Sequence, residues 1–126
     1  SFWLAAYRMA CLLRRGDRWR AAAILNGPLR QDLVDMIAWH AQVAGVPAVD
    51  TWFNGRFLEE WADARVTAVL SQTFARYDSA DLRRALLVMM DLFEWLSVEV
   101  GERQQYAYPE TAVEALRSWI GAVLAV

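Results

Sequence analysis

The stretch "SADLRRALLVMMDLFEWLSVEVGERQ", residues 79–104, decides the fold because its apolar residues recur at alternating steps of four and three. The recurring positions are Leu82, Leu86, Met89, Phe93, Leu96 and Val100. This spacing lines one side of a helix with apolar side chains and is typical of the seam of a helical bundle. It predicts the longest helix of the chain, which begins after an N-cap at Asp78 or Ser79.

Helical periodicity continues on both sides of this helix, and no strand alternation or internal repeat stands out. Further helices are expected over residues 2–15, 18–25, 28–44, 56–62 and 63–77, and from Pro109 onward. The first three of these helices are separated by residues typical of N-caps and helix ends, namely Asp17, Asn26-Gly27-Pro28 and Gly45. The one irregular stretch is "VPAVDTWFNG", residues 46–55. The sequence therefore predicts an all-α bundle of about six to seven helices around one long central helix.

The composition narrows the classes of function. Hydrophobic residues make up 57% of the 126 residues, enough for one domain with its own core. The net charge of −2 gives no reason to expect nucleic acid as a partner, and no apolar run reaches the ~18 residues of a membrane span. All 13 basic residues are arginine, so a phosphate site would use guanidinium groups. The single cysteine, Cys11, is interpreted as a core residue and fits a cytoplasmic location.

His40, the only histidine, falls on the apolar stripe of the helix expected over residues 28–44. Catalysis there would need a nucleophile, a metal or a pair of carboxylates, and the surrounding sequence has none of their motifs. Metal-ligand spacings and a Gly-rich phosphate loop are also missing. We therefore expect a core or cleft-wall histidine with one hydrogen bond, no catalytic residue and no metal site.

The aromatic residues leave two interpretations open. Trp95 and Trp119 lie on or beside apolar stripes and are expected in the core. Four others are harder to place inside one small bundle, namely Trp3, Tyr7, Trp39 and Trp52. They either pack into the core after all or line an aromatic cleft suited to flat or sugar-like ligands.

Arg56 is the most informative charge because it follows the irregular stretch, near the start of an expected helix. Backbone N–H groups at a helix start favour an anion, which makes Arg56 a candidate anion contact. The commoner arrangement is a surface arginine paired with Glu59 or Glu60 at i+3 or i+4.

Taken end to end, the chain resembles the C-terminal helical domain of the aminoglycoside 6-adenylyltransferases, which modify streptomycin. The matching pieces are "FW" at 2–3 with Tyr7, "LN" at 25–26, Arg30 to His40, Gly55 to Trp61, Leu92 to Glu102, and "YAYP" at 106–109. The resemblance covers almost all of the chain.

The resemblance implies a two-domain enzyme that transfers AMP from ATP to a drug hydroxyl. Its N-terminal nucleotidyltransferase domain holds Mg²⁺ with aspartates and carries a Gly-Ser motif; this sequence contains neither a Gly-Ser pair nor Asp-x-Asp. We therefore expect residues 1–126 to be one substrate-side domain, inactive alone. Its partners would be that catalytic domain and an aminoglycoside, with ATP and Mg²⁺ as cofactors of the parent enzyme only.

By the same resemblance, Arg56 takes a position where the family usually has lysine and is expected to contact the ATP phosphates. Trp3, Tyr7, Trp39 and His40 would lie along the interdomain cleft. Glu99 and Glu102 would either attract the cationic drug or pair within the bundle. For both glutamates, pairing within the bundle is the favoured interpretation. The mild overall acidity is at odds with a strongly negative drug cleft. The alternative function is a free-standing helical module that binds a separate nucleotidyltransferase subunit.

Overall fold

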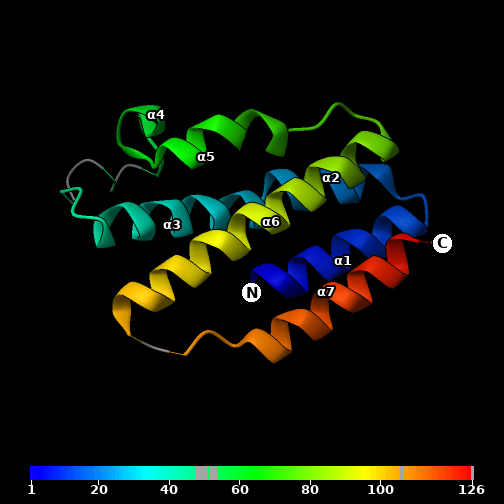
Figure 1. The fold of residues 1–126 in the computed structure, drawn as a ribbon. Coiled ribbons are helices and arrows are strands. Elements are labelled where there is room, and N and C mark those ends of the chain that lie inside the picture. The colour runs from blue at the N-terminus through cyan, green and yellow to red at the C-terminus, as the bar shows by residue number, and fades with distance from the viewer. Residues whose placement is uncertain (48–50, 52–53, 106, 126) are drawn as a thin grey trace.

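The computed structural model describes residues 1–47, 51, 54–105 and 107–125. Within this part of the chain every regular element is helical, so the all-α prediction is confirmed (Figure 1). The helices are α1 (Phe2–Arg14), α2 (Arg18–Asn26), α3 (Pro28–Val43), α4 (Leu58–Trp61), α5 (Ala64–Val69), the 3-10 helix η2 (Leu70–Thr73), α6 (Ser79–Gln104) and α7 (Glu110–Leu124).

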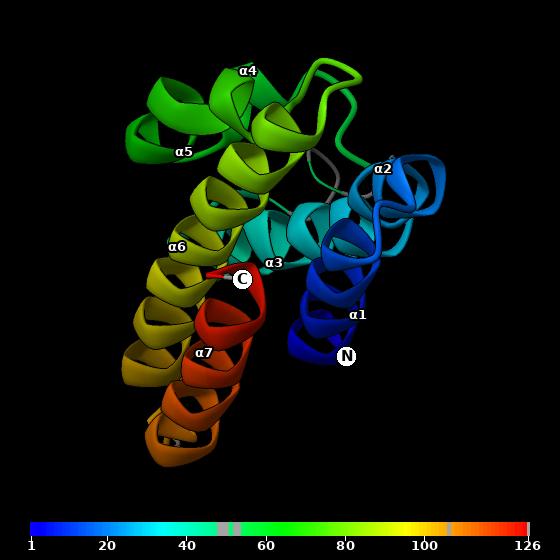
Figure 2. The ribbon, with the colours of Figure 1, turned by 90° about the vertical axis from the view of Figure 1, so that its right-hand side faces the viewer.

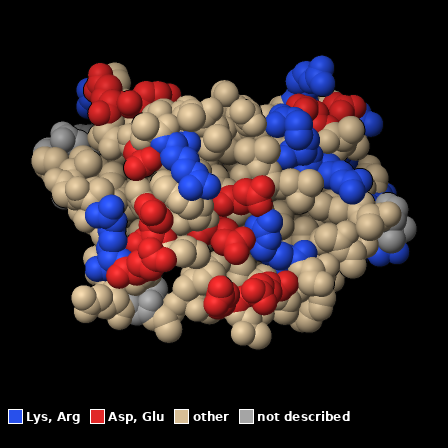
Figure 3. Space-filling view, viewed as in Figure 1, with Lys and Arg blue, Asp and Glu red and all other residues tan. Residues whose placement is uncertain are grey.

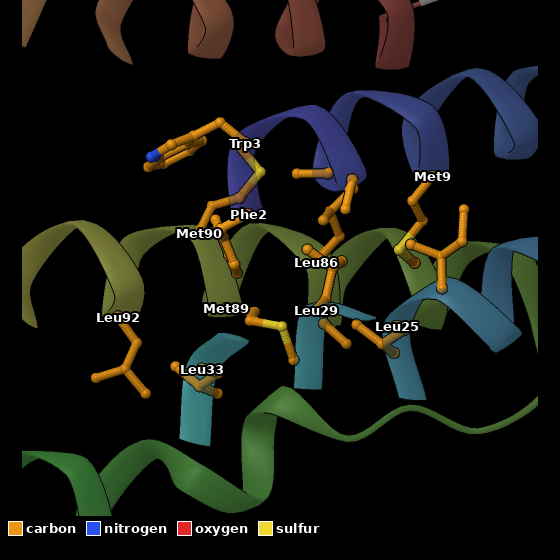
Figure 4. Close-up of a cluster of buried hydrophobic side chains, with 14 of the residues drawn as sticks. Phe2, Trp3, Met9, Leu25, Leu29, Leu33, Leu86, Met89, Met90 and Leu92 are labelled. Atoms are coloured by element: carbon orange, nitrogen blue, oxygen red, sulfur yellow. The ribbon is translucent and has the colours of Figure 1, made fainter. Parts of the chain in front are cut away.

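The predicted seam of α6 forms the centre of the core. Helix α6 packs against α1, α2, α3, α5 and η2. Its seam residues Leu82, Leu86, Met89, Leu96 and Val100 are buried, and Phe93 is half-buried against the same core. Figure 4 shows Leu86 and Met89 of this helix facing Leu25, Leu29 and Leu33. Each fully buried side chain of this size contributes roughly 1.5–3 kcal/mol relative to an exposed one, so the seam accounts for much of the folding free energy.

The helix boundaries follow the predicted capping residues. The Asp17 side chain accepts a hydrogen bond from the Arg20 N–H at 3.2 Å, and Asp78 accepts one from the Asp81 N–H at 2.9 Å. Pro28 occupies the first turn of α3, where its missing N–H costs nothing. Gly45 follows α3 with φ +101°, a backbone conformation that residues with a Cβ rarely adopt.

Helix α1 packs against α2, α3, α6 and α7 and leaves its outer side exposed (Figure 2). Phe2 stacks on Phe93 with ring centroids 3.9 Å apart, and Trp3 lies edge-on to both rings. Trp3 is only 8% exposed, so the core accommodates it. The expectation that Trp119 lies in the core is wrong, since it is 59% exposed. Trp119 lies beside the apolar stripe of α7 in the sequence, but the adjacent Ile120 is the residue that is buried.

The helix expected over residues 63–77 is wrong, because α5 ends at Val69 and η2 ends at Thr73. Phe74 is extended, with ψ 149°. Two arginines from other helices donate hydrogen bonds to the backbone carbonyls of residues 72–74. Arg30 Nη2 donates to Thr73 O at 2.9 Å, and Arg84 donates to the carbonyls of residues 72 and 74. Those carbonyls would otherwise accept from the next helical turn. The helix expected over 56–62 is also shorter, because it begins at Leu58.

Asp81 provides a pH-dependent tie at the start of α6. Its Oδ1 accepts a hydrogen bond from Arg84 Nε at 2.8 Å, and its Oδ2 accepts one from the Arg76 N–H at 2.7 Å. The Arg84 bond, followed by the Arg76 bond, lowers the pKa of Asp81 from 3.8 to about 2. A carboxylate whose pKa is lower in the folded protein than in the unfolded chain stabilises the folded state when the pH is above the unfolded-state pKa. This stabilisation is lost as the pH falls through the folded-state pKa.

We therefore expect wild-type protein to be more stable than Asp81→Asn above pH about 4, with the gap closing as pH falls to about 2. Urea unfolding of both proteins across this range measures the gap. A gap that stays constant down to the lowest pH would contradict the role of the Asp81 carboxylate.

Candidate functional site

His40 and Glu99 meet where the C-terminal ends of α3 and α6 lie together. His40 Nε2 lies 2.9 Å from Glu99 Oε1, a hydrogen-bond distance. The histidine side chain is 3% exposed, whereas the glutamate side chain is 34% exposed. The predicted histidine with one hydrogen bond is thus confirmed, and so is the predicted pairing of Glu99 within the bundle. The buried ring holds a carboxylate that still reaches solvent.

Trp95 extends this pair into a junction of three helices. It lies one turn before Glu99 on α6, with its ring centroid 5.1 Å from that of His40. From α5, the Arg65 guanidinium carbon lies 4.3 Å from the Trp95 ring centroid, within the range of a cation–π contact. We name Arg65, His40, Trp95 and Glu99 the three-helix junction.

The sequence analysis missed Arg65 and Trp95 as members of this junction. The i, i+4 spacing of Trp95 and Glu99, which puts both on one face of α6, could have indicated the tryptophan. No local signal marks Arg65, because α5 reaches α6 only through tertiary packing.

The other predicted aromatic residues do not gather into one wall. Trp3 is buried beside Phe93, and Trp39 is 42% exposed although it adjoins His40 in sequence. Tyr7 is half-buried and borders a surface hollow with Cys11, which is likewise half-buried rather than in the core. Trp52 lies outside the described residues.

Arg56 lies on a different side of α3 from the junction. Thr51 Oγ1 accepts a hydrogen bond from Gln42 at 2.8 Å, and Asn54 Oδ1 accepts one from Gln31 at 2.8 Å. Gln31 and Gln42 stand nine residues before and two after His40, which places both roughly 180° around the helix from it. Thr51 and Asn54 therefore lie against the face of α3 opposite His40.

The local structure of Arg56 also differs from the expected helix start. Helix α4 begins two residues later, at Leu58, after Phe57 in the left-handed conformation. The Arg56 carbonyl accepts a hydrogen bond from Trp61 Nε1 at 2.9 Å, and its guanidinium carbon lies 4.9 Å from the Phe57 ring centroid. The side chain is exposed at the protein surface.

Four carboxylates and one arginine lie on α6 from Asp91 onward. The carboxylates are Asp91, Glu94, Glu99 and Glu102, and the arginine is Arg103. Arg117 of α7 pairs with the first two, at 2.7 Å and 2.9 Å. Among the described residues no arginine pairs with Glu99 or Glu102. On the face shown in Figure 3, acidic side chains are most numerous in the left and central parts, where arginine side chains also lie among them, and further arginines lie at the upper right. The surface around Glu99 therefore carries mixed charge, since Arg103 lies one turn after it on α6 and Arg65 belongs to the same junction.

Among the residues that the structure describes, no group of three or more His, Cys, Asp or Glu side chains is placed to hold a metal ion. None of the described helices has the length and apolar character needed to cross a membrane.

The sequence of this chain matches the model of a known protein family. The family model described as streptomycin adenylyltransferase matches residues 1–123. The chain belongs to this family. No curated protein and no solved structure gave a significant match. Membership of the streptomycin adenylyltransferase family confirms the resemblance found in the sequence and indicates a nucleotidyltransferase domain as the partner of this helical domain.

Proposed function

We propose that residues 1–126 form the substrate-side domain of an enzyme that transfers AMP from ATP to an aminoglycoside hydroxyl. The family match over residues 1–123 supports this class of reaction. In this proposal the catalytic domain holds ATP and Mg²⁺ and performs the in-line transfer. The helical domain supplies contacts to the drug and to the nucleotide phosphates.

The observation that carries the drug contact is the His40–Glu99 hydrogen bond of 2.9 Å. A carboxylate held by a buried ring keeps one orientation, so little side-chain entropy is lost when a ligand binds. The ammonium and guanidinium groups of aminoglycosides form charge-assisted hydrogen bonds to such a group. The charges around Glu99 are mixed, so in this proposal the drug is held by the oriented carboxylate itself, and further negative charge would come from the catalytic domain.

For the nucleotide, we propose that Arg56 contacts the ATP phosphates through its exposed guanidinium group. Arg56→Ala is expected to raise the KM for ATP about tenfold, since one charge-assisted hydrogen bond contributes roughly 1.5–3 kcal/mol. The KM for the drug should stay unchanged because Arg56 and Glu99 lie on opposite sides of α3. Steady-state kinetics of the intact enzyme measures both constants.

Arg103→Ala is the matched control, since Arg103 is an exposed arginine at the far end of α6. It should leave the KM for ATP unchanged. Equal ATP kinetics for Arg56→Ala and wild type would refute the proposed phosphate contact.

The proposed reaction is tested with the intact protein, ATP, Mg²⁺ and a panel of aminoglycosides that includes streptomycin. Drug-dependent release of pyrophosphate, with a matching gain of one AMP in the mass of the drug, is the expected result. No release with any drug of the panel would overturn the proposal and favour the interaction-module alternative.

A further inference from the structure

The charges of this chain are strongly segregated. Eight exposed arginines belong to α1, α2 and the segment from residue 76 to the second turn of α6: Arg8, Arg14, Arg15, Arg18, Arg20, Arg76, Arg83 and Arg84. Only Asp17, Asp78 and Asp81 accompany them, so this region carries a net charge of +5. The remainder of the chain carries −7, and the formal total of −2 hides both values. We name this region the arginine end, and Figure 2 looks onto it.

Surface hollows and contacts link these arginines into one region. Arg14 and Arg83 border a hollow between α1, α6 and α7. Arg8, Arg15 and Arg20 border a second hollow beside Tyr7. Arg14 and Arg15 border a third one, next to Val123. The guanidinium groups therefore surround the shared end of α1 and α7.

Most of these guanidinium groups are available to a ligand. Arg20 pairs with Asp17, and Arg76 and Arg84 pair with Asp81. Within the described part of the chain, the other five form no ion pair with a carboxylate: Arg8, Arg14, Arg15, Arg18 and Arg83. A guanidinium group presents a planar fork of donors that matches phosphate oxygens.

The arginine end also exposes aromatic rings. Trp19 is 73% exposed and Tyr77 is 57% exposed, and their ring centroids lie 6.5 Å apart in an edge-to-face arrangement. The Arg18 guanidinium carbon lies 5.3 Å from the centre of the Tyr77 ring. Trp19 is the most exposed of the large hydrophobic residues described. Its indole is held by a neighbouring ring but covered by nothing in the described structure.

We propose that the arginine end binds single-stranded nucleic acid. Sites of this kind combine a positively charged surface along the phosphates with exposed rings on which bases stack. An acidic peptide would use the arginines but has no flat bases to cover Trp19 and Tyr77. A duplex keeps its bases stacked internally and would likewise leave the rings unused. The expectation against nucleic acid rested on the net charge, which averages over two regions of opposite sign.

The test measures binding of a fluorescein-labelled oligouridylate of about 12 nucleotides to the intact protein by fluorescence anisotropy, with excess ATP present to occupy any nucleotide site. Four or five phosphate contacts would give a slope of about −3 for log K against log salt concentration. Trp19→Ala is expected to weaken binding about tenfold, the effect of losing one stacked base. Arg18→Gln should weaken binding and make the salt slope shallower by about 0.7.

Two matched variants control for general effects on the surface. Trp39→Ala removes another exposed tryptophan, near the C-terminal end of α3, and Arg103→Gln removes an exposed arginine from the opposite end of α6. Both should bind the oligonucleotide like wild type. Circular dichroism of every variant verifies that the helical fold is retained.

Several results would overturn the proposal. One is the absence of salt-dependent binding, and another is equal binding by wild type and Trp19→Ala. Equal affinity for a duplex of the same length, or competition by polyglutamate at equal charge, would show that charge alone is recognised. Because aminoglycoside kinetics are measured separately, failure here leaves the proposed transferase function untouched.

Discussion

Leu86→Ala is expected to lower the free energy of unfolding by about 3 kcal/mol, the middle of the range for truncating a buried leucine. Leu86 has no exposed surface and lies at the centre of the α6 seam, facing Leu29 of α3 (Figure 4). The substitution removes apolar contacts on several sides and leaves a cavity that the long helix cannot collapse to fill. Urea unfolding followed by circular dichroism measures the change.

Leu87→Ala is the matched control because it makes the same chemical change one residue further along α6. Leu87 is 40% exposed, so its truncation should change the free energy of unfolding by roughly 0.5 kcal/mol or less. A similar loss for both variants would mean that the seam of α6 does not form the centre of the core.

Glu99→Gln is expected to raise the KM for the aminoglycoside at least tenfold in the intact enzyme. The change removes the negative charge but keeps an oxygen at the same place, so the hydrogen bond with His40 can persist. A hydrogen bond to a charged group contributes roughly 1.5–3 kcal/mol, which corresponds to a factor of about 10 to 100. The KM for ATP should remain that of wild type. Steady-state kinetics with each substrate varied in turn separates the two effects.

Glu102→Gln makes the same change at an exposed carboxylate one turn further along α6. It should alter the drug KM far less, because no buried ring fixes the orientation of Glu102. If the two variants raise the KM equally, the drug responds to the general negative potential of the surface and not to the His40–Glu99 pair.

The parts of the fold that follow from short-range patterns could be predicted from the sequence. The α6 seam depends on spacing within one helix, and the starts of α2 and α6 depend on Asp17 and Asp78 beside them. The position of His40 on the buried stripe of α3 is equally local. For these features the residues that determine the structure lie within a few positions of one another.

Features that depend on distant residues could not be predicted. The end of η2 depends on Arg30 and Arg84, which bind the carbonyls of residues 72–74 from other helices. The three-helix junction depends on α5 bringing Arg65 over Trp95. The separation of Arg56 from Glu99 depends on the hydrogen bonds that Thr51 and Asn54 form with Gln42 and Gln31 of α3. Neither spacing nor composition contains this information.

The ties between α3 and α6 restrict how the domain can move. At one end Arg30 and Arg84 both hold the short segment around Thr73, and at the other end His40 holds Glu99. Sliding or rotating one helix against the other would break hydrogen bonds at both ends. The two helices are therefore expected to move as one unit, so in the proposed two-domain enzyme any movement of Glu99 toward a substrate would be a movement of the whole helical domain, without shear between α3 and α6.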